Sequence, residues 1–279
     1  MIKEYFELNF DNGKVKGDLR YNKGSKMPFI FFFHGFKVFR NWGFIPYICD
    51  KLALHNYNVI NIDYSKNGII DSDKLIYDSE TFANQTISSH FQDCQNIYQY
   101  VCEENFINDV NIKDIWDDRI FCIGHSMGGA LSYLLSSKVH IDKIVSLAAV
   151  SQFERNTERQ KLAWRERGFT EIRMDGSEQI LKLNYSYVDD KEKNFPQNIV
   201  LESINKYKGK YLVIQAQNDM VAKLTDAKQL YDAGSYKDNK ELFVIEGTGH
   251  TFSASHPLVG ENKYLRSLVN KTLDFFNED

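Results

Sequence analysis

Gly124-His125-Ser126-Met127-Gly128 is the stretch that decides the fold, and Gly129 follows it directly. The five residues fit the pattern G-x-S-x-G, which needs a strand before it and a helix after it. A short β-prone run precedes the stretch at 119–123, and a run of small residues and leucines typical of a helix follows at 130–137. We therefore predict a strained turn at Ser126, with glycines at 124 and 128 leaving room for the neighbouring backbone.

Apolar strands alternate with helices on both sides of this turn. Asn12-Gly13 separates β-prone runs at 2–10 and 15–21, which predicts a hairpin. Residues 28–33 read Pro-Phe-Ile-Phe-Phe-Phe, and a strand that is apolar on both faces belongs at the centre of a covered, largely parallel sheet. Further strands are predicted at 59–64, 143–150, 211–216 and 242–245, and helices at 46–55, 87–104, 225–233 and 264–276, with Thr225 as a helix cap. This order predicts an α/β fold with a doubly wound, mostly parallel sheet.

Composition excludes several classes of protein. Hydrophobic residues at 43% and charged residues at 26% are globular values. A formal net charge of −4 offers no basic footprint for nucleic acid or for an anionic membrane. No apolar run approaches the length of a membrane span, and the first residues do not have the pattern of a secretory signal. The four cysteines lack metal-site spacing, so we expect thiols in a reducing cytoplasm.

Four polar segments follow strands and should meet at one edge of the sheet, because parallel strands end at the same edge. They are His34-Gly35-Phe36, Ser126, Asp219 and His250. A serine hydroxyl is too weakly acidic to attack unaided and needs a base. We predict that His250 is this base and that Asp219 orients its imidazole, in the chain order Ser, Asp, His.

Alternatives exist for two of these roles. His256 lies in the same loop as His250 and is a rival base, and Asp226 and Glu154 are rival acids. An oxyanion would need two backbone N–H donors, and we expect them from Met127, directly after the serine, and from Phe36, in the loop after the third strand.

Together these motifs resemble the α/β-hydrolase superfamily, nearest to its serine esterase, acylaminopeptidase-like and cinnamoyl (feruloyl) esterase branch. The resemblance rests on His34-Gly35-Phe36, residues 124–129, Asn218-Asp219 with Val221, and Gly249-His250-Thr251-Phe252. It implies one α/β-hydrolase domain over 1–279, with a cap insertion over the active site at 151–208. Dienelactone hydrolases have a cysteine as nucleophile, whereas this chain has Ser126, and the His-Gly-Gly-Gly run of the hormone-sensitive-lipase branch is absent.

The resemblance also implies a function. We expect a serine hydrolase that cleaves small carboxylic esters through an acyl-enzyme, without a metal or an organic cofactor. Amide or acylpeptide hydrolysis, thioester hydrolysis, and a non-catalytic ligand-binding role on a hydrolase scaffold stay open, as does a homodimer. Five aromatic residues are predicted to wall the substrate pocket, the alternative being that those of the insertion only form its own small core: Phe39, Trp42, Trp164, Tyr185 and Tyr187.

Overall fold

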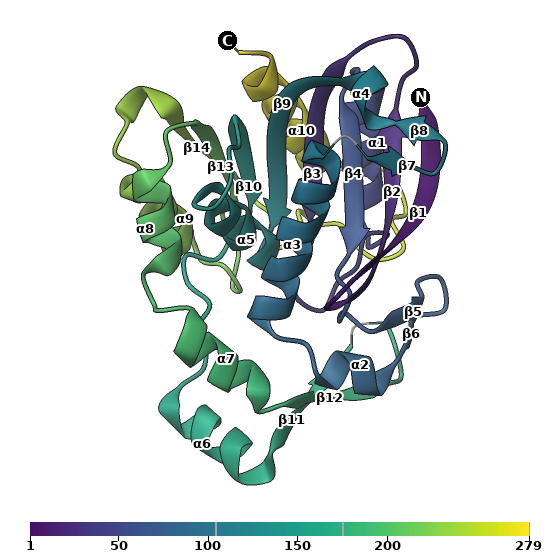
Figure 1. The fold of residues 1–279 in the computed structure, drawn as a ribbon. Coiled ribbons are helices and arrows are strands. Elements are labelled where there is room, and N and C mark those ends of the chain that lie inside the picture. Colours follow the sequence, from purple (N-terminus) through teal and green to yellow (C-terminus); the bar gives the residue numbers. More distant parts are fainter. Residues whose placement is uncertain (104, 175, 279) are drawn as a thin grey trace.

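An eight-stranded sheet forms the centre of the protein (Figure 1). The computed structural model describes residues 1–103, 105–174 and 176–278. Counted from one edge of the sheet, the first and second strands are antiparallel to each other, and so are the second and third. All other neighbouring strands in the sheet are parallel. In spatial order the strands are β1 (Ile2–Phe10), β2 (Gly13–Tyr21), β4 (Asn58–Asp63), β3 (Met27–Phe33), β9 (Trp116–His125), β10 (Lys143–Leu147), β13 (Lys210–Ala216) and β14 (Lys240–Ile245). The predicted doubly wound, mostly parallel sheet and its N-terminal hairpin are confirmed.

Helices cover both faces of this sheet (Figure 1). One face carries α1 (Ile45–Leu54) and α10 (Lys263–Asn277), and the other carries α3 (Ile87–Cys102), α5 (Met127–Ser136), α8 (Ile199–Lys206) and α9 (Leu224–Ala233). The side chains of β3 explain this arrangement. Phe29, Phe31 and Phe33 enter one hydrophobic core, and Ile30 and Phe32 enter the other. All five are fully buried, as expected for a strand that is apolar on both faces.

Four features differ from the sequence predictions. Thr225 does not cap α9, because the helix begins at Leu224 and Lys223 is its N-cap residue. The carboxylate of Asp226 accepts the Lys223 N–H at 2.9 Å instead. The connection at 65–84 contains β5 (Ile69–Asp71), β6 (Ile76–Tyr77) and α2 (Ser79–Ala83), which the sequence pattern did not predict. A further unpredicted group before β9 comprises β7 (Phe106–Ile107), β8 (Val110–Asn111) and α4 (Ile112–Ile115), and the short helix η1 (Lys237–Asn239) precedes β14.

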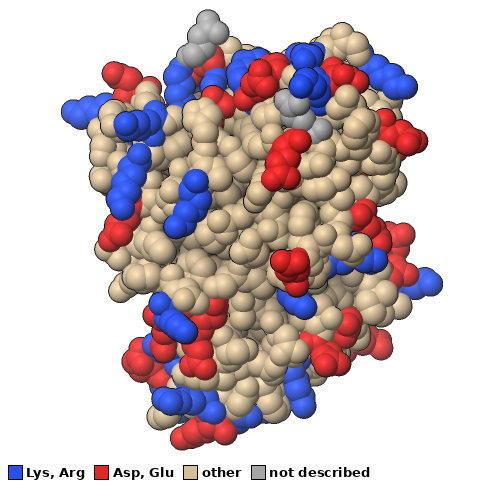
Figure 2. Space-filling model, in the orientation of Figure 1, with Lys and Arg blue, Asp and Glu red and all other residues tan. Residues whose placement is uncertain are grey.

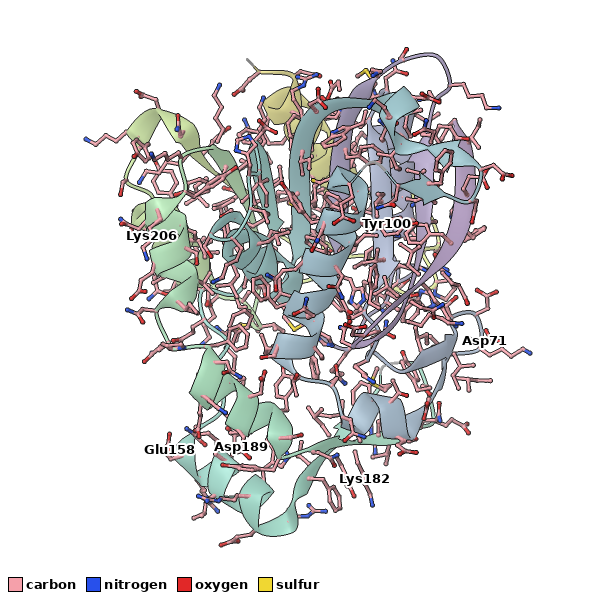
Figure 3. The ribbon with its side chains drawn as sticks, viewed as in Figure 1. Asp71, Tyr100, Glu158, Lys182, Asp189 and Lys206 are labelled. Atoms are coloured by element: carbon pink, nitrogen blue, oxygen red, sulfur yellow. The ribbon has the colours of Figure 1, made fainter. Side chains whose placement is uncertain are left out.

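The chain between β10 and β13 leaves the sheet at the carboxyl ends of the parallel strands (Figure 1). It forms α6 (Glu158–Arg167), β11 (Phe169–Arg173), β12 (Ile180–Asn184) and α7 (Ser186–Asn194) before α8 returns to the helical layer beside α5 and α9. Figure 3 marks Glu158, Lys182 and Asp189 in this part of the chain. Trp164, Leu183 and Val188 form a separate small core with Phe82 of α2. The loop after β10 and the helix α2 therefore build one structure beyond the sheet edge.

The surface charges are mixed in sign, and the cysteines are unpaired. Positive and negative side chains are interspersed over the face drawn in Figure 2. All four cysteines are free thiols, and three of them are buried. Within the described ranges, every helix is too short or too polar to span a membrane.

Candidate active site

Ser126 lies on the predicted strained turn between β9 and α5. Its backbone angles are φ 55° and ψ −116°, a conformation that non-glycine residues seldom adopt. The Ser126 N–H donates to the carbonyl of Leu147 on the neighbouring strand β10 at 2.9 Å. The turn is therefore held by the sheet itself, with the serine at the N-terminal end of α5.

Close backbone contacts explain the glycines around the serine. A Cβ on Gly128 would lie 2.0 Å from the carbonyl oxygen of Phe33, and a Cβ on Gly124 would lie 2.2 Å from the carbonyl oxygen of Gly128. Gly35 approaches the serine from the loop after β3, since a Cβ there would lie 3.0 Å from the Cβ of Ser126. The His34-Gly35-Phe36 segment thus lies directly against the turn, as the topology predicted.

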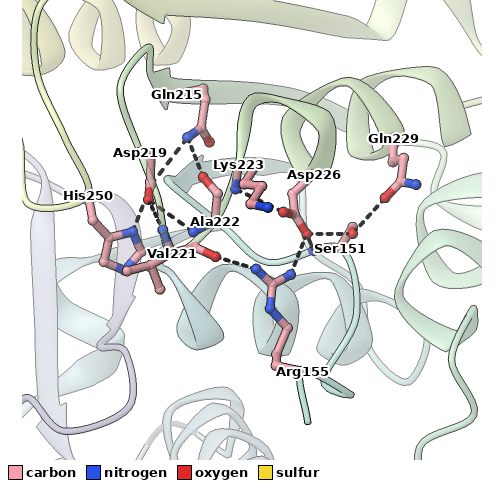
Figure 4. Close-up of polar contacts among 10 residues, drawn as sticks. All are labelled: Ser151, Arg155, Gln215, Asp219, Val221, Ala222, Lys223, Asp226, Gln229 and His250. Atoms are coloured by element: carbon pink, nitrogen blue, oxygen red, sulfur yellow. Dashed lines mark hydrogen bonds and ion pairs between the residues drawn. The ribbon is translucent and has the colours of Figure 1, made fainter. Parts of the chain in front are cut away.

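His250 and Asp219 form a hydrogen-bonded pair (Figure 4). The distance from His250 Nδ1 to Asp219 Oδ2 is 2.7 Å. The other carboxylate oxygen of Asp219 accepts the N–H groups of Val221 at 2.7 Å and Ala222 at 3.0 Å. Asp219 is buried, and Gln215 Nε2 donates to its Oδ2 at 3.3 Å. These donors fix the carboxylate so that Oδ2 faces the imidazole.

His125 brings the His250 loop to the serine. The Nε2 atom of His125 lies 3.1 Å from the carbonyl oxygen of His250, and the two rings are 4.8 Å apart. Burial lowers the pKa of His125 to about 3, so this imidazole is neutral and its Nε2–H can donate to the carbonyl. Within the described chain, no hydrogen bond joins Ser126 Oγ to His250 Nε2. Such bonds in ligand-free sites often tighten only when substrate binds.

The rival base and acids lie elsewhere. His256 accepts the Gly43 N–H at 3.1 Å, and its ring stacks on Trp42. Asp226 holds the start of α9 and accepts hydrogen bonds from Ser151. Glu154 lies beside lysines of α6 and α7. Of the predicted alternatives, the structure therefore brings together Asp219 and His250.

A cavity of about 730 Å³ opens at Ser126. The two predicted oxyanion donors, Phe36 and Met127, line it together with the serine. Met127 is the first residue of α5, where backbone N–H groups lack partners within the helix. Apolar and aromatic side chains supply most of the remaining wall, including Val150, Phe153, Ala163, Trp164, Phe169, Ile172, Leu183, Tyr187, Met220 and Val221.

Two of the five predicted pocket aromatics line this cavity, namely Trp164 and Tyr187. Their rings stack with centroids 6.3 Å apart, and Trp164 Nε1 donates to the carbonyl of Leu183 at 2.9 Å. The other three are not among the lining residues. Phe39 and Trp42 contact His256, with ring centroids 5.1 Å and 6.3 Å away, and Tyr185 lies at the edge of Trp164. The structure therefore places these three outside the wall of this cavity, since sequence could not give the direction in which each loop turns.

Comparisons with known proteins agree with this architecture. Est1E from Butyrivibrio proteoclasticus, solved with bound ferulic acid, superimposes with a TM-score of 0.70 at 16% identity over 97% of each chain. Alpha/beta hydrolase domain-containing protein 10 from mouse gives a TM-score of 0.71 at 15% identity, covering 98% of each chain. The alpha/beta hydrolase GrgF from Penicillium sp. sh18 also gives 0.71 at 15% identity, over 99% of this chain and 98% of its own.

The chain has the α/β-hydrolase fold.

No family model matches the sequence. No curated protein matches it either. At this level of identity, the comparisons establish the α/β-hydrolase fold, and the site must be argued from its own geometry.

Sequence reasoning missed most of the polar groups of the cavity wall. Gln152, Asn156 and Gln160 contribute amides, and the cations are Arg155, Arg167 and Lys191. For Lys191 the sequence shows its spacing from a predicted pocket residue but not its burial. Lys191 follows Tyr187 by four positions on α7, so both side chains share one face of that helix.

Other nucleophiles and metal ligands are poorly placed for chemistry. Burial raises the pKa of the Cys49 thiol to about 12 and also raises the pKa of Cys122, which holds both thiols protonated. Among the residues that the structure describes, no group of three or more His, Cys, Asp or Glu is arranged to hold a metal ion.

Proposed function

We propose that the protein is a serine hydrolase that cleaves small carboxylic esters through an acyl-enzyme. Ser126 is the nucleophile, His250 the general base, and Asp219 the residue that orients the base. The single observation that carries this proposal is the 2.7 Å contact between His250 Nδ1 and Asp219 Oδ2. With its proton held at Nδ1 by the carboxylate, the imidazole keeps the Nε2 lone pair free to accept the serine proton.

The chemistry follows from these positions in two halves. Ser126 Oγ attacks the ester carbonyl while His250 Nε2 takes its proton, and the N–H groups of Met127 and Phe36 stabilise the oxyanion. His250 then protonates the departing alcohol, which leaves the acyl group on the serine. A water molecule, deprotonated by the same Nε2, attacks the acyl group, and the released acid leaves Ser126 protonated again.

The chain segment at 151–208 acts as a cap on a single domain that spans 1–279. Its residues from α6, β11, β12 and α7 wall the cavity above the serine. A cavity of about 730 Å³ suits a substrate of small-molecule size. Est1E, a protein of similar fold, binds ferulic acid, which supports an ester with an aromatic group as substrate.

The test compares the wild type and Ser126→Ala on p-nitrophenyl esters from acetate to octanoate and on a hydroxycinnamate methyl ester. Loss of the nucleophile should lower kcat by roughly 10⁴–10⁶-fold on every ester that the wild type cleaves. Thermal unfolding of both proteins checks that the variant folds. Full activity in Ser126→Ala, or a wild type that cleaves none of these esters, contradicts the proposal.

A further inference from the structure

The charges that line the cavity are all of one sign. Three cationic side chains reach its wall, and no carboxylate side chain is among the described residues that line it. The chain as a whole has a net charge of −4, and each of the three cations lies 2.8 to 3.7 Å from a carboxylate oxygen of a residue that does not line the cavity. A negatively charged ligand is therefore favoured only where one of these cations has an N–H group left to donate.

Two of the three cations are accounted for by neighbours on the protein. Arg155 bonds to the Asp226 carboxylate at 2.8 Å and also donates to the carbonyl of Val221 (Figure 4). Arg167 is 58% exposed and lies 3.7 Å from a carboxylate oxygen of Glu171. Neither arginine is a buried charge that still needs a partner.

Lys191 is different, because its side chain is only 3% exposed. Its ammonium donates to Asn156 Oδ1 at 2.9 Å and, over a longer distance of 3.5 Å, to Oε1 of the Glu154 carboxylate. Glu154 also accepts the Asn156 N–H and lies 3.9 Å from Lys161. Burial lowers the pKa of Lys191, although Glu154 acts in the opposite direction. An ammonium has three N–H donors, and Asn156 and Glu154 accept from two of them, which leaves one N–H of this cavity-lining lysine for a ligand.

Apolar surface lies between this cation and the serine. Tyr187 and Phe36 both line the cavity, and their ring centroids are 5.6 Å apart. The Lys191 ammonium lies 5.4 Å from the Tyr187 ring centroid. A ligand that reaches both Ser126 and Lys191 would have an ester at one end, an apolar body, and an anion at the other end.

We propose that the cavity selects esters that carry a second, remote carboxylate, and that Lys191 binds this carboxylate. Suitable substrates are half-esters of dicarboxylic acids and carboxyaryl esters. This inference rests on the proposed function, because it assigns a substrate class to the same serine. A charge-assisted hydrogen bond from a buried lysine to a carboxylate should favour such substrates about tenfold to 100-fold over neutral analogues.

The experiment uses two matched pairs of esters. The first pair is mono-p-nitrophenyl octanedioate and its methyl ester, and the second is 4-carboxyphenyl butanoate and 4-carbamoylphenyl butanoate. For each ester, kcat/KM is measured with the wild type, Lys191→Met, Lys191→Arg and Lys193→Met. Lys193 is the matched control, because it is an exposed lysine on the same helix. Comparing variants on each ester cancels differences in leaving-group reactivity.

Lys191→Met should lower kcat/KM for both esters of a pair by different factors. In at least one pair, the factor for the carboxylate ester should be about ten times that for the neutral ester, or more. Lys191→Arg should restore most of the difference, and Lys193→Met should affect both esters equally. If Lys191→Met changes both members of both pairs by the same factor, the proposal is wrong.

A binding measurement tests the inference without the Lys191 variants, in case these do not fold. Ser126→Ala protein is titrated calorimetrically with the intact esters of the second pair and with the octanedioate pair. Tighter binding of a carboxylate ester, by about tenfold, supports the inference, and equal binding in both pairs overturns it. If the enzyme cleaves neutral and carboxylate esters equally well and this cleavage depends on Ser126, the proposed function stands and only the inference about Lys191 is wrong. A wild type that cleaves no ester would count against the proposed function instead.

Discussion

Asp219→Asn tests the orientation of the base. In the wild type, one carboxylate oxygen accepts the N–H groups of Val221 and Ala222, and the other faces His250. An asparagine must keep its oxygen toward the two N–H donors, which turns its amide nitrogen toward His250 and toward Gln215 Nε2. The His250 ring can then bond to this amide only by accepting at Nδ1, which moves its own proton to Nε2.

A proton on Nε2 prevents His250 from accepting the serine proton. The corresponding loss in a serine protease triad is about 10⁴-fold in kcat. We expect kcat/KM for p-nitrophenyl butanoate to fall about 10³–10⁴-fold, equivalent to about 4–5.5 kcal/mol of transition-state stabilisation.

Asp226→Asn is the matched control. Asp226 is also a buried aspartate, but it contacts Ser151, Arg155 and the start of α9 rather than His250. Its substitution should lower thermal stability and leave kcat/KM within about threefold of the wild type, since no reacting group depends on it directly. An Asp219→Asn enzyme that folds and stays within tenfold of wild-type kcat/KM would refute the reasoning.

The remaining predictions concern stability and the pocket. Burial raises the pKa of Asp93 from 3.8 to about 6, so its ionisation destabilises the fold as pH rises through that interval. The free energy of unfolding of Asp93→Asn relative to wild type, from urea titrations, should therefore rise by about 3 kcal/mol between pH 3.5 and 7, and a pH-independent difference would contradict this. Gly128→Ala should destabilise the protein by about 3 kcal/mol or more in the same assay, because its Cβ would lie 2.0 Å from a backbone oxygen. Gly260→Ala, in open space, should change stability by less than about 0.5 kcal/mol, and equal losses would refute the packing argument. Trp164→Ala should lower kcat/KM for aryl esters about tenfold, whereas Trp42→Ala, which lies outside the cavity wall, should stay within about twofold; the reverse order would show that the cavity is misassigned.

Strong local signals account for what sequence could predict. The apolar run of β3 predicts a central strand, because only apolar residues suit a strand that is buried on both faces. The glycines around Ser126 predict a tight turn, because close backbone contacts leave no room for a Cβ. Parallel strands end at the same edge of a sheet, and this rule predicted that Ser126, Asp219 and His250 lie at one edge, although it gave no distances between them.

The internal packing of the segment at 151–208, which was predicted to be a cap, could not be derived from the sequence. Its small core draws Trp164 and Val188 together with Phe82 of α2, which comes from a different part of the chain. Short elements of this kind depend on tertiary contacts rather than on local propensity. Lys191 was missed for the same reason, since a lysine on a charged helix is normally exposed and only the folded segment at 151–208 buries it.

The most direct test of the central claim is covalent labelling with an alkyl fluorophosphonate, which reacts with activated serine nucleophiles. Intact-mass and peptide mass spectrometry would be applied to the wild type, Ser126→Ala and His250→Ala. We predict one adduct per wild-type chain, located on Ser126, with none in Ser126→Ala and strongly slowed labelling in His250→Ala. A wild-type adduct on another residue, or labelling that persists in Ser126→Ala, would contradict the assignment of Ser126 as the activated nucleophile.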